Sequence, residues 1–179
     1  MPVQTKRKKN KPPWSDVKAK LGGFDKAGLM QLVSDLDDYK KRVALALAPD
    51  VYRKHNAEVS VATAKKAISE YNKAAGDPLG ILELRLFWCE TAVKFSMDFG
   101  YADQGYFDCL AIQYQEACRS LPVLDEPLLS NTIERLENLR DDAQMGHGVG
   151  DFMGDVLSEA LLDLPCSQVE AVVPQLKET

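Results

Sequence analysis

The stretch from Leu79 to Gly100 constrains the fold most, because on a helix it carries two apolar stripes. A helix that is apolar on two sides has to be covered from two sides, so we expect it at the centre of a helical pack. Its polar positions form only a narrow strip, which contains Glu83 and Glu90. The stripes are Leu79, Leu82, Leu86, Cys89, Val93 and Met97 on one side, and Ile81, Leu84, Trp88, Ala92, Phe95 and Phe99 on the other.

Helix-start and helix-stop residues divide the rest of the chain into further helices. Asp77 followed by Pro78 is typical of a helix start, and the short junction after 60–75 predicts an antiparallel hairpin with 78–99. Segment 26–48 predicts one long helix or two joined near 37–38. The other predicted starts are Ser15, Asp25 with Phe24 packed on Leu29, Ser60, Asp103, about Glu126, and Asp151, which would open a helix with Phe152, Val156, Ala160 and Leu161 inward.

These segments predict an all-α fold of about six to seven helices, packed as antiparallel pairs around a central helix at 78–99, superhelical or bundle-like. No stretch shows useful β-alternation. The predicted core comprises Leu82, Leu86, Trp88, Val93, Phe95, Phe107, Leu110 and Tyr114.

The chain of 179 residues, 45% of them hydrophobic, fits one domain. We expect a disordered basic arm at 1–13, a single helical domain at 14–165 and a short tail at 166–179. Five of the six residues 6–11 are basic, which leaves 17 Lys and Arg against 27 Asp and Glu elsewhere. Such an acidic body argues against a broad nucleic-acid surface, so nucleic acid could bind only through the arm, at residues such as Lys8 and Lys9.

Cysteine spacing and hydropathy point to a cytoplasmic protein. The four cysteines form no C-x-x-C pair, which favours reduced thiols. No apolar run follows Met1, and charged residues interrupt the longest hydrophobic stretch, so we predict neither a signal peptide nor a membrane span.

Five blocks of the sequence stand out together: WSDVKAKL at 14–21, KAGLMQLVSDL at 26–36, SVATAKKAISEY at 60–71, GYADQGYFDCL at 100–110 and GHGVGDFMGD at 146–155. These blocks resemble an uncharacterised family of small bacterial proteins that is catalogued as a domain of unknown function. The resemblance implies a bacterial, cytosolic, helical protein, and it carries no activity, cofactor or catalytic residue. The family pattern has an additional segment between the positions matching Leu36 and Tyr39, which this chain lacks.

The glycine-rich stretch 145–151 has two interpretations. Its alternating glycines could expose backbone N–H groups to an anion or a partner, with Gly148 and Gly150 as the contacts. A phosphate-binding loop would need a preceding strand and another glycine spacing. We favour the other interpretation, a sharp turn in which Gly148 or Gly150 has positive φ and Asp151 caps the next helix.

The same region offers weak candidates for a metal site. His147, Asp151, Asp155 and Glu159 could approach one another, but zinc or iron usually recruits more imidazole or thiolate, and an acidic stripe is usually a solvated face. We predict no metal, no cofactor and no Ser-His-Asp or Cys-His catalytic set.

Two further side-chain groups have a functional and a structural interpretation. Glu90 could be a buried acid that faces Lys65 or Lys66, or it could form a surface pair with Lys94. The aromatic residues could line a ligand groove or pack on Trp88 and Phe99. They are Tyr101, Tyr106, Phe107 and Tyr114.

The leading hypothesis is a non-enzymatic protein–protein interaction or scaffold module that presents a groove or face to another protein or to a copy of itself. The alternatives are a nucleic-acid-associated protein that uses the arm, and a metal-dependent enzyme at 146–159.

Overall fold

The computed structural model describes residues 26–49, 58–144, 146–165 and 168, and side chains from residue 35 onward. In this part the chain forms six α-helices, one 3-10 turn and no strand, which confirms the all-α class. The helices are α2 (Lys26–Leu47), α3 (Val61–Ala74), α4 (Pro78–Phe99), α5 (Gln104–Cys118), α6 (Glu126–Asp142) and α7 (Val149–Leu162), with a 3-10 turn η1 (Leu121–Val123) before α6.

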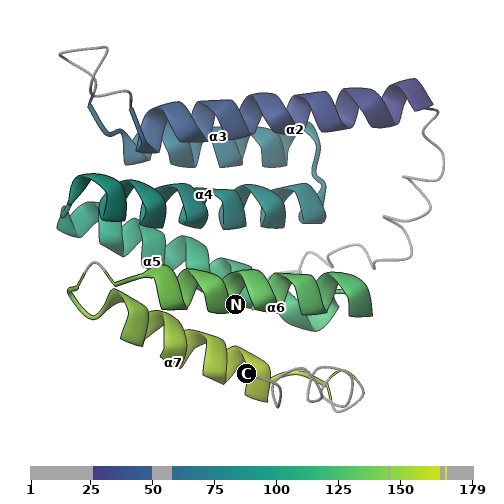
Figure 1. The fold of residues 1–179 in the computed structure, drawn as a ribbon. Helices are drawn as coiled ribbons and strands as arrows, with labels where there is room; N and C mark the ends of the chain where they lie inside the picture. The colour runs from purple at the N-terminus through teal and green to yellow at the C-terminus, as the bar shows by residue number, and fades with distance from the viewer. Residues whose placement is uncertain (1–25, 50–57, 145, 166–167, 169–179) are drawn as a thin grey trace, which may run out of the picture.

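Successive helices run in opposite directions and pack as pairs (Figure 1). The helices α2, α4 and α6 lie side by side and run in the same direction, while α3, α5 and α7 each return along the helix before them. The central helix α4 packs against α2, α3, α5 and α6. This is the central position that its two apolar stripes predict.

Side-chain caps fix where three helices begin, as the sequence predicts. Ser60 Oγ accepts from the backbone N–H of Thr63 at 3.3 Å, and Asp103 Oδ1 accepts from that of Tyr106 at 2.8 Å. The Asp77 carboxylate accepts from two N–H groups, those of Leu79 and Gly80. Segment 26–47 is a single helix. The predicted helix after Ser15, the cap at Asp25 and the arm at 1–13 lie outside the described residues.

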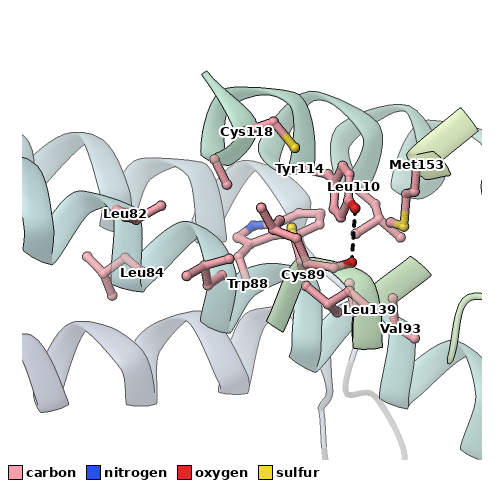
Figure 2. Close-up of a cluster of buried hydrophobic side chains, with 14 of the residues drawn as sticks. Leu82, Leu84, Trp88, Cys89, Val93, Leu110, Tyr114, Cys118, Leu139 and Met153 are labelled. Carbon is pink, nitrogen blue, oxygen red and sulfur yellow. Dashed lines mark hydrogen bonds between the residues drawn. The ribbon is translucent and has the colours of Figure 1, made fainter. Parts of the chain in front are cut away.

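The core forms where α4 meets its neighbours (Figure 2). Trp88 is fully buried, and the centroid of its ring lies 6.0 Å from that of the Tyr106 ring. The hydroxyl of Tyr114 donates to the carbonyl of Leu136 at 2.9 Å, which satisfies a polar group inside the core (Figure 2). All eight predicted core residues are buried: Leu82, Leu86, Trp88, Val93, Phe95, Phe107, Leu110 and Tyr114.

Three residues of the predicted apolar stripes are more exposed than expected. Met97 and Phe99 lie in the last turn of α4, which Gly100 ends in the left-handed conformation, and they remain 47% and 46% exposed. Phe152 is also partly exposed, because it lies outside the buried face of α7. The buried face of α7 is formed by Val149, Met153, Val156 and Leu157.

Candidate functional site

A groove follows α4 along its contact with α6, and Leu36 of α2 lines the first part of it. Its first part is a hollow of about 280 Å³, whose wall is mainly apolar. Leu82 and Leu86 form the floor and are buried, whereas Leu36 and Leu128 form the sides and are half-buried. The other lining residues are Tyr71, Asp77, Leu79, Gly80, Glu83, Asn131, Thr132 and Arg135.

The groove continues toward the C-terminal end of α4 as a second hollow of about 460 Å³. Val93 and Leu139 form its apolar floor, and its rim is charged. Arg135 lines both hollows, so they adjoin along α4. The rim residues are Glu90, Lys94, Met97, Asp98, Arg135, Asn138 and Asp142.

An ion cluster spans the groove where its two parts meet, and we call it the Arg135 cluster. Arg135 donates to Glu83 Oε2 at 2.5 Å and to Glu90 Oε1 at 2.8 Å. Lys40 of α2 donates to the same Glu83 at 2.8 Å. The cluster comprises Lys40, Glu83, Glu90 and Arg135, and it joins α2, α4 and α6 through charge-assisted hydrogen bonds.

The electrostatics of the cluster favour its charged form. Burial raises the pKa of Glu83, but the hydrogen bonds from Arg135 and Lys40 outweigh it, so the pKa lies below the ordinary value of 4.5. Burial likewise lowers the pKa of Arg135, and Glu83 and Glu90 more than compensate. A carboxylate held ionised between two cations is poorly suited to donate a proton at neutral pH. The geometry therefore favours a clamp between helices over a catalytic acid.

The structure corrects the sequence prediction for Glu90. This side chain faces Arg135 of α6, not Lys65 or Lys66, and Lys66 lies 3.7 Å from Glu70 of its own helix. Lys94 pairs with Asp98 at 3.1 Å. Sequence reasoning missed Arg135 altogether. The sequence feature that could have pointed to Arg135 is its place beside the apolar stripe of α6, next to the buried Leu136.

The glycine stretch forms a turn between α6 and α7. Gly148 is the N-cap of α7 with φ of 68°, as the turn interpretation predicts, and His147 also has positive φ, at 58°. Gly150 and Asp151 lie inside the helix, so Asp151 is not the cap. The open depression beside this turn is lined by three carboxylates, those of Asp141, Asp151 and Asp155, and by one cation, Arg140, which pairs with Asp141 at 2.8 Å. This acidic lining disfavours an anion.

The candidate metal ligands do not converge. The ring of His147 lies against Phe107, with 5.6 Å between centroids, while Asp151, Asp155 and Glu159 are exposed along α7. Within the described residues, no group of three or more His, Cys, Asp or Glu side chains is placed to hold a metal ion.

The aromatic residues after α4 pack on one another, as their structural interpretation predicts. Tyr101 contacts both Phe95 and Tyr106, at centroid distances of 5.5 and 5.0 Å. The hydroxyl of Tyr106 donates to the carbonyl of Leu47 at 3.3 Å. They therefore join α4 and α5 to the end of α2.

Other predicted positions carry less information about a site. Lys8, Lys9 and the rest of the arm lie outside the described residues, as does His55. Cys89, Cys109 and Cys118 are buried free thiols. Among the described helices, none combines the length and the apolar composition needed to cross a bilayer.

Comparisons with known proteins found no relative of this chain. No family model, no curated protein and no solved structure matches the chain.

Proposed function

We propose that this chain is a non-enzymatic interaction module, which binds a segment of another protein along the groove on α4. The observation that carries the proposal is the groove itself, with its apolar floor on α4 and α6 and its charged rim. Its first hollow, about 280 Å³, lies just below the size of pockets that take drug-sized ligands, roughly 300–1,000 Å³. It suits one or two side chains of a peptide, and the adjoining second hollow continues the same surface along α4.

The arrangement of charges supports a peptide over a small reactive substrate. The Arg135 cluster is internally neutralised at the centre of the groove, whereas Asn131 and Asn138 offer amides on α6. Recognition of a helix or an extended segment typically combines apolar anchors with such a polar rim. We also propose that the protein is a cytoplasmic member of the uncharacterised family of bacterial helical proteins that its sequence resembles.

The proposal is tested by comparing two Asn→Arg variants in the host. Asn131 is exposed on the wall of the groove, whereas Asn72 is exposed on α3 and lines neither hollow. Chemical cross-linking and mass spectrometry should detect a partner with the wild type and with Asn72→Arg. Asn131→Arg should lose the same partner, because a long cation would fill the mouth of the apolar hollow. Equal recovery of the partner by both variants would contradict the groove as its binding site.

A further inference from the structure

The groove carries an excess of negative charge that narrows the kind of segment it can bind. Five carboxylates and two cations line its two hollows, and Lys40 pairs with one of these carboxylates, which leaves an excess of two negative charges. Among the described residues, Asp142 has no ion-pair partner at the rim of the second hollow. A segment that fits this groove therefore has apolar anchors and several Lys or Arg side chains.

We infer that residues 6–21 of this same chain occupy the groove and compete there with a partner protein. These residues lie outside the described part of the chain, and it is their sequence that matches the groove. Five of the six residues 6–11 are basic, and Trp14, Val17 and Leu21 follow at spacings of three and four. The inference rests on the proposed function, because it names what fills the same surface.

The apolar anchors match the first hollow. Trp14, Val17 and Leu21 share one face if the segment is helical, as the Ser15 start predicts. The floor at Leu82 and Leu86 offers apolar surface to such a face, and the half-buried Leu36 and Leu128 flank it. Covering these side chains removes apolar surface from water, which stabilises the docked segment.

The connection to α2 is long enough for docking within one molecule. α2 begins at Lys26, and Leu36, which lines the first hollow, lies ten residues further along the helix. Ten helical residues span about 15 Å. The five-residue connection from Leu21 to Lys26 can extend to roughly 17 Å, so a nearly extended connection brings Leu21 back toward the level of Leu36. Gly22 and Gly23 in this connection permit the reversal of direction.

The test uses the two tryptophans of the chain, Trp14 and Trp88. Trp88 is fully buried, so the variant Trp88→Phe leaves Trp14 as the single fluorophore. Acrylamide, a neutral quencher, should quench Trp14 in the full chain several-fold less than in a peptide of residues 1–22. If Trp88→Phe does not fold, the accessible tryptophan fraction of the wild-type chain gives the same information, since buried Trp88 is protected from the quencher.

Variants and solution conditions distinguish docking in the groove from burial of Trp14 elsewhere on the molecule. Asn131→Arg should raise the quenching of Trp14 toward the peptide value, and Asn72→Arg should leave it low. High salt should also raise it, because it screens the attraction between the basic segment and the rim. Protection should not change on dilution, since the segment and the groove belong to one molecule.

Several outcomes would overturn the inference. Quenching of Trp14 at the peptide rate would show that the segment is not docked, and protection that Asn131→Arg leaves unchanged would place it elsewhere. Protection that is lost on dilution would assign the segment to a second copy. The cross-linking experiment could show that only Asn131→Arg loses the partner, while acrylamide quenches Trp14 as freely as in the peptide. This pair of results would overturn the inference and leave the proposed function standing.

Discussion

The ring of Tyr71 in α3 occupies the space that a side chain at Gly80 in α4 would need. A Cβ built on Gly80 would lie 2.6 Å from Cζ of Tyr71 and would overlap its hydroxyl. Tyr71 is buried and packs edge-on against Tyr39, with ring centroids 5.4 Å apart, so it has little freedom to move. The glycine thus sets how closely α3 and α4 approach.

We therefore expect Gly80→Ala to destabilise the protein, although alanine is the better helix former. Overpacking of this kind typically costs about 1–3 kcal/mol. The matched control is Gly154→Ala in α7, where the new Cβ would meet only Arg140 Cδ at 3.5 Å. The free energy of unfolding of that variant should rise by up to about 1 kcal/mol, because alanine has the higher helix propensity. Urea unfolding of both variants checks the prediction, and equal stability gains at the two positions would contradict the contact.

The central position of α4 predicts a large cost for Leu86→Ala. Leu86 is 1% exposed, so its truncation removes buried apolar surface and leaves a cavity, at a cost of about 2–5 kcal/mol. Leu45→Ala is the matched control, because Leu45 is 70% exposed on α2. A denaturation curve for Leu86→Ala that overlays the wild type would show that α4 is not the centre of the core.

The lowered pKa of Glu83 predicts how its contribution to stability depends on pH. A carboxyl group whose pKa is lower in the folded state stabilises that state fully above its unfolded value of 4.5, and the contribution disappears as pH falls through the folded pKa. Glu83→Gln should therefore have a lower free energy of unfolding than the wild type at pH 7. The gap should narrow as the pH falls below about 4.5.

Thermal unfolding of both proteins across this pH range measures the gap. Glu70→Gln is the comparison, because the pair of Glu70 with Arg42 at 2.5 Å lies at the surface. Salt screens such a pair, so this variant should show a smaller gap that shrinks further in high salt. A gap for Glu83→Gln that is constant from pH 7 to pH 3 would contradict the role of the Arg135 cluster.

Burial of the thiols predicts slow chemical labelling of the native protein. Burial raises the pKa of the Cys118 thiol to about 12, and it raises that of Cys89 as well, so little thiolate forms at neutral pH. We expect both cysteines to react with iodoacetamide only as fast as the chain opens, and rapidly in urea. Mass spectrometry of labelled peptides distinguishes the sites, and fast native labelling of Cys118 would contradict its burial.

Local sequence signals predicted the elements well, because caps and apolar periodicity act within a few residues. Asp77 with Pro78, for example, marks the start of α4 in both sequence and structure. The groove was harder to predict, since the partner of Glu90 depends on how α6 is aligned along α4. Arg135 lies 45 positions away, and no local pattern specifies that register. The inward face of α7 is set by its packing against α5 and α6, which the apolar pattern of α7 alone does not specify.

The bond from the Tyr106 hydroxyl to the Leu47 carbonyl has a consequence for how the molecule unfolds. It joins the last residue of α2 to α5 across 59 positions of the chain. A helix end leaves carbonyl groups without partners inside the helix, and here the group from α5 satisfies one of them. The first helical pair therefore depends on a later part of the chain to complete its end. Hydrogen exchange at the end of α2 should consequently report a shared cooperative unit with α5, rather than the fraying of an independent hairpin.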